Sequence, residues 1–389
     1  MKIYECILSL LSGIGVFILA IELLSDSLTK LAGEKMKLLL KKIAGNRIKG
    51  VLVGALVTAV IQSSTATTIM VIGFVNANMM DLYQAAAIII GANIGTTITG
   101  LLASLESLNI SLYLSLLCFI GVMLTFIRRT KKIANLLIGL GMIFVGLKLM
   151  SSSCDDESIR SGFKSVFEKI NFPLLLEFLG ILFTAIIQSS SAMTGIVIVM
   201  ISNQAMNVKN ALFITLGANI GTCVTALIGV IGGNINSKRA AIIHLTFNFF
   251  GCTLFTPFLW IFTDKIIYIL ESIVSKEAVQ IAIFHLFFNC ITAIITTPLI
   301  KFLVKFSEFV IRDKKDNILE KLIDNVDDMS AITRSEESIN KKNEENEFFL
   351  KEKKKENDIN INNKDKNGEN NLIKDNINED SEKRNEGFL

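Results

Sequence analysis

Long apolar runs separated by short polar segments make up the first 305 residues of the chain. A run of about 20 apolar residues is long enough to cross the roughly 30 Å hydrocarbon core of a bilayer as a helix. The clearest such runs are residues 3–24, 108–127, 133–150, 240–262 and 279–303. The pattern therefore predicts an all-α polytopic membrane protein.

The pattern changes near residue 306. Residues 306–334 mix apolar and charged positions, which predicts an amphipathic cytoplasmic segment. Residues 335–389 are rich in Asn, Lys, Glu and Asp. A segment of this composition buries too little apolar surface to offset its chain entropy, so we expect a disordered polar tail.

A cluster of polar residues interrupts one apolar stretch. Residues 54–68 read GALVTAVIQSSTATT, with four consecutive polar residues from Gln62 to Thr65. About 11 apolar residues precede the cluster and about 10 follow it, so each arm reaches only half way across a bilayer. Non-helical backbone at that depth is tolerated only against protein or a watery cavity. The pattern therefore predicts a re-entrant helical hairpin with the polar cluster at its tip.

The chain contains an internal repeat at an offset of 126 residues. Residues 180–194, GILFTAIIQSSSAMT, match residues 54–68 at ten of fifteen positions, and GANIGT occurs at both 91–96 and 217–222. Duplicated halves of this kind are typical of secondary transporters. The expected divisions are transmembrane repeat 1 at 1–126, transmembrane repeat 2 at 127–264 and an additional transmembrane helix at 265–305.

The number of crossings between the two polar clusters predicts how the repeats are oriented. Three crossings, an odd number, separate the two hairpins, so they should enter the membrane from opposite faces as inverted repeats. The loops on one predicted side carry 13 Lys and Arg residues, against 7 on the other. The positive-inside rule makes the richer side cytoplasmic. We therefore expect a multi-pass protein of the cell membrane, with its N-terminus outside and its C-terminal tail in the cytoplasm.

Two glycines flank Ala-Asn-Ile within each GANIGT motif. Glycine costs roughly 1 kcal/mol in a helix interior, so the pair predicts a break in each transmembrane helix. A broken helix exposes carbonyl groups, which suit cations, and N–H groups, which suit anions.

The residues of these segments narrow the possible chemistry. Residues 51–77 and 82–105 contain no Asp, Glu, Lys or Arg, and the second copy adds only Glu177 and Lys209. Hydroxyl and carbonyl oxygens suit Na⁺ rather than transition metals, and hydroxyl and N–H groups can hold a small oxyanion. An anion held by neutral groups in a low dielectric needs a countercharge, which co-bound Na⁺ would supply.

Composition and motifs exclude other classes. The chain is 51% hydrophobic, too apolar for an ordinary soluble enzyme. Its net charge of +3 indicates no nucleic-acid partner, because Lys and Arg gather in loops and the tail. No GxSxG motif surrounds either serine cluster, so the sequence does not predict an enzyme. Two further motifs are HLTFN with His244 and HLFFN with His285. They favour a structural pair in which each histidine caps a neighbouring backbone over a metal or proton site.

Two Gln-Ser-Ser segments, each followed 29 residues later by GANIGT, resemble the sodium-dependent phosphate cotransporter family, the type II Na⁺/Pi transporters with their bacterial relatives. The resemblance covers roughly residues 1–305. It implies Na⁺-coupled symport of inorganic phosphate by alternating access, with Na⁺ as the coupling ion and no other cofactor. The implied phosphate-binding residues are Ser63, Ser64, Thr65, Ser189, Ser190 and Ser191, and the implied sodium-binding residues are Gln62, Asn93, Thr96, Gln188, Asn219 and Thr222.

The chain departs from the family pattern at its end. Many bacterial members carry a helical PhoU-like regulatory domain there, but the roughly 85 residues after Lys305 are too few and too polar for one. A PhoU-like regulator would therefore be a separate protein. Two alternatives to phosphate symport stay open. One is Na⁺-coupled transport of another small anion such as a dicarboxylate or sulfate, and the other is a non-transporting membrane sensor or scaffold.

Overall fold

The computed structural model describes residues 3–41, 46–108, 110–127, 130–153, 156–170 and 172–313, and every element within them is helical. The tail predicted at 335–389, and the amphipathic segment from residue 314 on, lie outside these residues. The helices are α1 (Ile3–Lys41), α2 (Arg47–Ile61), α3 (Ser64–Asn76), α4 (Leu82–Ser104), the 3-10 helix η1 (Leu105–Leu108), α5 (Ser111–Thr125), α6 (Lys131–Ser153), α7 (Glu157–Lys169), α8 (Pro173–Ile187), α9 (Ser190–Ser202), α10 (Val208–Gly229), α11 (Ile235–Ile273), α12 (Glu277–Thr296) and α13 (Ile300–Val310).

Six helices among the described residues are long and apolar enough to cross a membrane: α1, α4, α6, α10, α11 and α12. Together with the all-helical fold, they confirm the prediction of a multi-pass α-helical membrane protein. The span expected at residues 108–127 is wrong in length, because η1 occupies Leu105–Leu108 and α5 keeps only 15 residues. At 1.5 Å per residue, α5 is about 22 Å long, short of a full crossing.

The first helix is longer than the apolar run at residues 3–24 that predicts it. Helix α1 continues without interruption to Lys41, because residues 25–41 are mostly good helix formers such as Leu, Lys, Glu and Met. The added turns are held by packing, since Leu24 and Leu40 are buried. The polar residues from Ser25 to Lys41 therefore lie on a helix and not in a loop.

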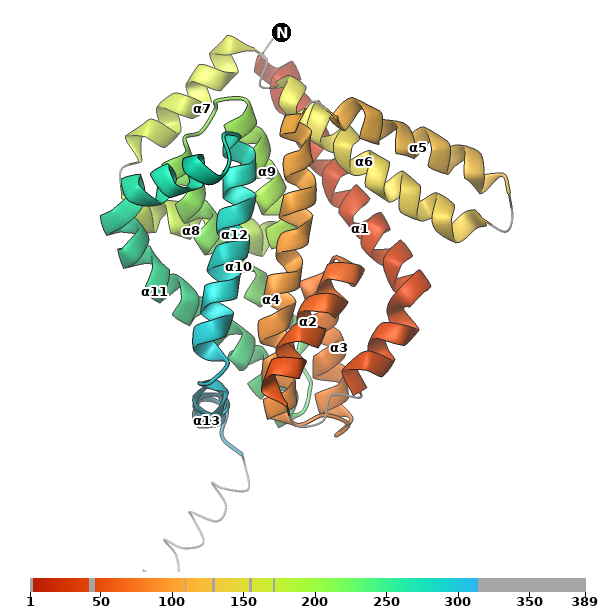
Figure 1. The fold of residues 1–389 in the computed structure, drawn as a ribbon, viewed down its shortest axis with the longest axis vertical. Coiled ribbons are helices and arrows are strands. Elements are labelled where there is room, and N and C mark those ends of the chain that lie inside the picture. The colour runs from red at the N-terminus through yellow and green to blue at the C-terminus, as the bar shows by residue number, and fades with distance from the viewer. Residues whose placement is uncertain are drawn as a thin grey trace, which may run out of the picture. The chain divides into compact units, whose positions relative to one another are not determined.

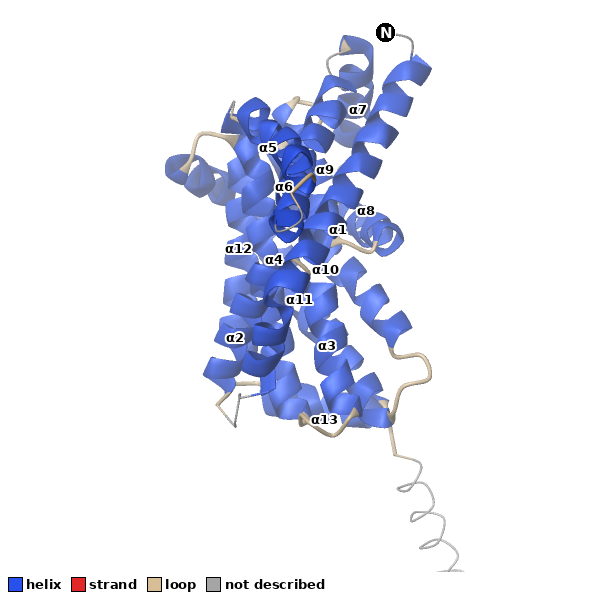
Figure 2. Cartoon of the chain, turned by 90° about the vertical axis from the view of Figure 1, so that its right-hand side faces the viewer, coloured by secondary structure: helices blue, strands red, loops and turns tan. Residues whose placement is uncertain are grey.

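The two helical hairpins lie in opposite halves of the molecule (Figures 1 and 2). Helices α2 and α3 occupy the half that ends at α13, called the lower end, and α8 and α9 occupy the half that ends at α7, called the upper end. Helices α4 and α10 run through the middle and pack against both hairpins. Helices α5 and α6 form a pair that projects to one side (Figure 1).

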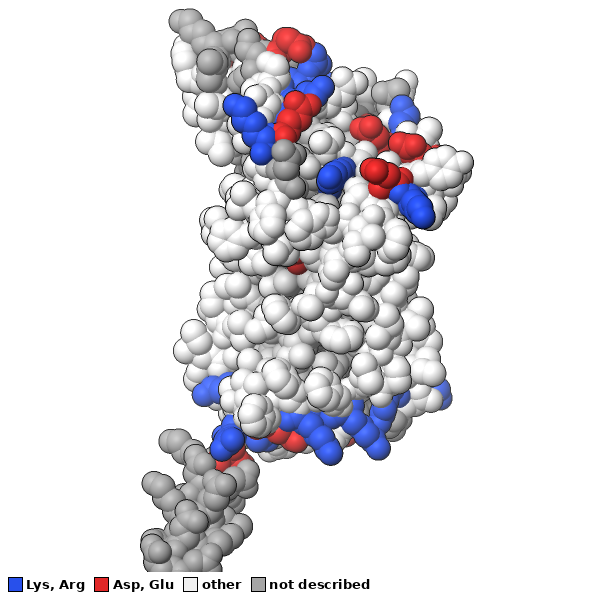
Figure 3. Space-filling model, turned by 90° about the vertical axis from the view of Figure 1, so that its left-hand side faces the viewer, with Lys and Arg blue, Asp and Glu red and all other residues white. Residues whose placement is uncertain are grey.

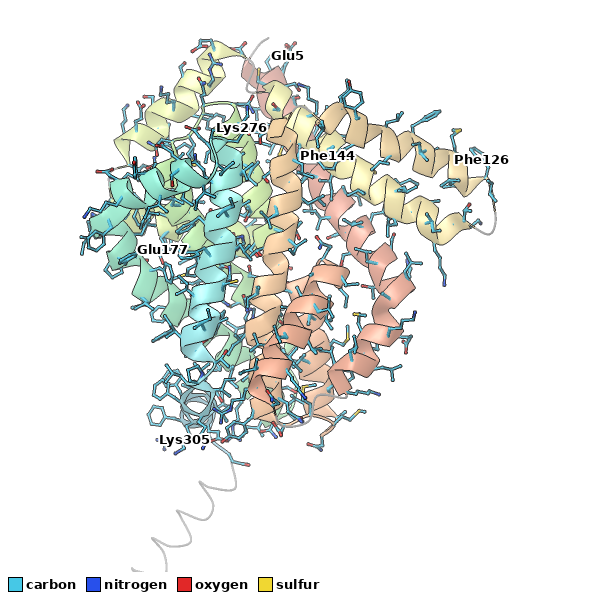
Figure 4. All side chains as sticks on the ribbon, viewed as in Figure 1. Glu5, Phe126, Phe144, Glu177, Lys276 and Lys305 are labelled. Atoms are coloured by element: carbon cyan, nitrogen blue, oxygen red, sulfur yellow. The ribbon has the colours of Figure 1, made fainter. Side chains whose placement is uncertain are left out.

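On the face shown in Figure 3, charged side chains gather at the two ends of the molecule and are sparse on the band between them. The lower end carries mainly Lys and Arg, whereas the upper end carries both signs. Lys305 lies at the lower end, and Glu5 and Lys276 lie at the upper end (Figure 4). An apolar band between charged ends is the surface expected of a protein that spans a bilayer.

The breaks expected at the GANIGT motifs are wrong: α4 and α10 pass through both motifs as unbroken helices. The glycines serve helix packing. A Cβ atom on Gly91 would overlap the Val51 carbonyl oxygen of α2, and one on Gly217 would overlap the Glu177 carbonyl oxygen of α8. Each GANIGT helix therefore presses directly on the first arm of its hairpin.

Helix α11 is kinked rather than straight. Pro257 lies inside it and Phe262 has non-helical backbone angles, φ −112° and ψ 21°. Proline removes one helical hydrogen bond and bends the chain. The division expected between residues 264 and 265 falls just past this kink and stays a prediction, as do the other domain boundaries.

Candidate functional site

The chain leaves the helix at the same residue type in both hairpins. Gln62 ends α2 with φ 61° and ψ 21°, and Gln188 ends α8 with φ 60° and ψ 21°. This left-handed conformation costs a non-glycine residue roughly 1–2 kcal/mol. The predicted tips are therefore found at the polar clusters, and both have the same strained geometry.

The serine after each glutamine starts the second arm of its hairpin. Ser63 has an extended backbone and its Oγ accepts a hydrogen bond from the Ala66 N–H at 3.1 Å. Ser189 does the same with the Ala192 N–H at 3.2 Å. These N-caps leave other first-turn N–H groups of α3 and α9 without helical partners. A helix N-terminus with free N–H groups is a ready site for an anion.

The two tips face one cavity of about 460 Å³. Both Gln-Ser-Ser segments contribute to its wall, together with Thr222 and Thr225 of α10 and one face of α1. The residues of the predicted site that line it are Gln62, Ser63, Ser64, Thr65, Gln188, Ser189, Ser190, Ser191 and Thr222. The two Gln-Ser-Ser segments, which are 126 residues apart in the sequence, therefore line the same cavity.

Three serines of this cavity have side chains that form no hydrogen bond within the described part of the protein. Ser64, Ser190 and Ser191 are only 6%, 4% and 7% exposed. Among the described residues, no side-chain hydrogen bond is formed by any of these three hydroxyls. These hydroxyls line the cavity, so they are available to donate hydrogen bonds to a bound oxyanion.

The two glutamines are not equivalent. Gln62 is buried, donates to the Ala59 carbonyl oxygen and accepts from the Thr99 hydroxyl at 2.9 Å. Gln188 is exposed to the cavity, and its side chain forms no hydrogen bond to another described residue. The Gln62 amide is therefore occupied in holding its own tip, whereas the Gln188 amide is free to meet a ligand.

The polar residues of GANIGT are mostly turned back on their own helices. Asn93 Nδ2 donates to the Ile89 carbonyl oxygen at 2.9 Å, and Thr96 Oγ1 donates to that of Ala92 at 3.1 Å. In the second copy Asn219 and Thr222 form the matching bonds at 3.0 Å each. Of these four residues only Thr222 lines the cavity.

Asn219 has a further partner that the sequence did not predict. His285 Nε2 lies 3.3 Å from Asn219 Oδ1, and both side chains are almost fully buried. An amide oxygen can only accept, so His285 carries its proton on Nε2. The backbone-capping role expected for the histidines is therefore not what the structure has at His285. His244 is buried with no partner among the described residues.

Sequence reasoning also missed the polar face of α1. Glu22, Ser25 and Asp26 line the cavity opposite the hairpin tips. The apolar run at residues 3–24 ends between Glu22 and Ser25, so that run alone does not place the three residues on one helix. Their spacing was the available signal, because residues three and four apart lie on one side of a helix.

Substitutions at Gln188 should test the strained tip. Gln188→Asn should leave unfolding nearly unchanged, because Asn tolerates the left-handed region, whereas Gln188→Val should lower stability by roughly 1–2 kcal/mol, because a β-branched residue does not. Thermal unfolding of the purified protein in detergent measures the difference. Ile186→Val, at an exposed helical position, is the control and should be almost silent. Equal melting of the two Gln188 variants would contradict the tip geometry.

Membrane-crossing helices around a polar cavity at two helix N-termini define a membrane transport protein by architecture. A comparison with family models gives the family. The chain belongs to the Na⁺/Pi-cotransporter family, whose model matches residues 16–152 and 160–284.

Similar proteins agree with this family. The chain is 29% identical over 286 residues, 73% of its length and 91% of the relative's, to the Bacillus subtilis "Uncharacterized protein YqeW". It is 26% identical over 314 residues to the Escherichia coli "Putative inorganic phosphate export protein YjbB", with 80% of this chain but 56% of that protein covered. A segment of 99 residues is 34% identical to sheep "Sodium-dependent phosphate transport protein 2A", covering 25% and 15% of the two chains. No solved structure matches.

Proposed function

We propose that this protein is a Na⁺-coupled symporter of inorganic phosphate that works by alternating access in the cell membrane. One observation carries the proposal. The two Gln-Ser-Ser tips, each at a helix N-terminus, line one cavity, and the hydroxyls of Ser64, Ser190 and Ser191 have no hydrogen-bond partner among the described residues. Family membership and the names of the relatives support phosphate as the anion.

The charges around the cavity support coupling to a cation. No Lys, Arg or His lines it, so a bound phosphate would be held by hydroxyl and N–H groups alone. Two unit charges 4 Å apart interact by roughly 4 kcal/mol at an effective dielectric constant of 20. A sodium ion bound beside phosphate would supply stabilisation of that order, and its absence would weaken phosphate binding.

We assign phosphate to Ser63, Ser64, Thr65, Ser189, Ser190 and Ser191. For Na⁺ we favour Gln188 and Thr222, because both reach the cavity and the Gln188 amide is free. Gln62 can contribute its tip carbonyl, since its amide is engaged. Asn93, Thr96 and Asn219 do not line the cavity. They would therefore act on sodium through the helices that they stabilise.

The arrangement of the hairpins supports alternating access. Helices α2 and α3 have 15 and 13 residues, and α8 and α9 have the same lengths, so none can cross a bilayer alone. The hairpins lie in opposite halves, and α5 and α6 run out and back together (Figure 1). Because α5 and α6 together return to the side from which they leave, α4 alone determines the side of the membrane on which the second hairpin begins. We infer inverted re-entrant hairpins, with the Lys- and Arg-rich lower end in the cytoplasm.

Transport by the purified protein in liposomes tests this function. Uptake of ³²P-phosphate should require an inward Na⁺ gradient and should be lost when choline replaces Na⁺ at constant pH and voltage. Arsenate should compete, because its size and charge match phosphate, whereas sulfate and succinate should compete weakly. Equal uptake in choline would refute sodium coupling. Stronger competition by sulfate or succinate would assign the cavity to another anion.

The direction of phosphate transport is tested in a separate efflux experiment. The Escherichia coli relative bears the name of a phosphate export protein. A coupled carrier runs with the sum of its gradients, so vesicles loaded with Na⁺ and phosphate should release phosphate into Na⁺-free buffer. Uptake without efflux under these conditions would exclude export.

A further inference from the structure

One face of α1 forms the wall of the cavity opposite the hairpin tips. Ile18, Ile21, Glu22, Ser25 and Asp26 line the space and follow the i, i+3, i+4, i+7, i+8 spacing of a single helix face. Glu22 and Asp26 are one helical turn apart, and Ser25 lies between them on the same face. These are the cavity's only two carboxylates among the described residues that line it.

The same space holds an independent sign of a ligand. Ser64, Ser190 and Ser191 are each more than nine-tenths buried, line this cavity and have hydroxyls without a partner among the described residues. These hydroxyls come from α3 and α9, not from α1. They indicate that a ligand binds in this cavity, and this evidence does not depend on the two carboxylates.

Two carboxylates facing an anion site create a conflict of charge. Glu22 and Asp26 repel each other and any phosphate bound at the tips, and no basic side chain among the residues lining the cavity relieves this. A cation between α1 and the tips removes both repulsions at once. Carboxylate and hydroxyl oxygens are hard ligands that suit Na⁺.

We propose that the Glu22 and Asp26 carboxylates, with the Ser25 hydroxyl, form a Na⁺ site that joins α1 to the hairpin tips. The proposal rests on the proposed function, because it names ligands for the coupling ion of that same cavity. The site is separate from Gln188 and Thr222, which belong to α8–α9 and α10. A Na⁺ ion there ties the position of α1 to occupancy of the tips.

The variants Glu22→Gln, Asp26→Asn and the double change remove the charges with little change in shape. At saturating phosphate, each should raise the Na⁺ concentration for half-maximal uptake by about tenfold or more, since losing a metal-site partner typically costs 10- to 100-fold. Half-saturation by phosphate at saturating Na⁺ should change less than about twofold. Glu22→Asp keeps the charge and should restore most of the Na⁺ response.

The control is Glu34→Gln. Glu34 lies on the same helix, is exposed and pairs with Lys37 at 3.0 Å, away from the cavity. It should not alter Na⁺ activation. Unchanged Na⁺ activation in the double variant would overturn the proposal, as would an equal loss of Na⁺ and phosphate affinity.

A binding measurement separates this proposal from the proposed function. ²²Na⁺ should bind the purified protein in the absence of phosphate, and the double variant should lose at least part of that binding while eluting and melting as the parent does. If phosphate uptake fails in the parent but this difference persists, the cation site stands and the transport function falls. If parent and variant bind ²²Na⁺ equally, or the parent binds none, the cation site is wrong.

Discussion

Ser64→Ala and Ser190→Ala should each reduce Na⁺-driven phosphate uptake by about 10- to 100-fold. Each serine lines the cavity and its hydroxyl has no partner among the described residues, so the phosphate would be its acceptor. A hydrogen bond to a charged group contributes roughly 1.5–3 kcal/mol, which corresponds to a loss of this size. Initial rates of ³²P-phosphate uptake at saturating Na⁺ measure the effect, with protein incorporation determined in the same vesicles.

Neither alanine should impair folding. The parent hydroxyls make no hydrogen bond to lose, so the melting temperature should stay the same or rise. Ser153→Ala is the matched control, because Ser153 is equally buried at 1% exposure but already donates to the Met150 carbonyl oxygen at 2.6 Å. It should leave uptake intact. Normal uptake in both cavity variants would show that phosphate does not bind at the tips.

Gly91→Ala and Gly217→Ala should destabilise the protein by roughly 1–3 kcal/mol or more. Alanine normally stabilises a helix interior by about 1 kcal/mol relative to glycine. At these two positions we expect the opposite effect on stability. The reason is the close approach of α4 to α2 and of α10 to α8, where an added Cβ meets a rigid carbonyl oxygen. Thermal unfolding and the monodisperse fraction in detergent measure the loss.

Gly73→Ala is the control, because it tests the same substitution in a helix without a close neighbour. Gly73 lies within α3, and a Cβ there would have no neighbour within 4 Å. Alanine at this position should keep or raise the melting temperature. If Gly91→Ala melted like Gly73→Ala, the two helices would not be in the contact that the structure describes.

The hairpin tips could be predicted because their signal is local. Four polar residues between two apolar arms of half-bilayer length allow few other arrangements. The same pattern recurs 126 residues later, so the same inference holds at both positions. The structure has breaks at Gln62 and Gln188 with nearly identical backbone angles. The N-caps of Ser63 and Ser189 follow from the same few residues.

The GANIGT motifs were misread because glycine has two uses that a single sequence does not separate. Glycine weakens a helix, and it also lets another backbone approach. At Gly91 and Gly217 the second use decides, because the neighbouring arm of the hairpin fills the space of the missing side chain. The hairpin partner, which comes from another segment, determines which use applies.

The sequence by itself determined the helical membrane class, the two polar helix breaks and the internal repeat, because hydrophobic length and repetition are properties of the chain. Only the tertiary structure decided what faces the tips. Glu22 and Asp26 line the same cavity as Ser64 and Ser190 because α1 continues as a helix past Leu24. A sequence shows which residues are polar, whereas packing of distant helices sets which polar residues share a space and which charges an ion there must balance.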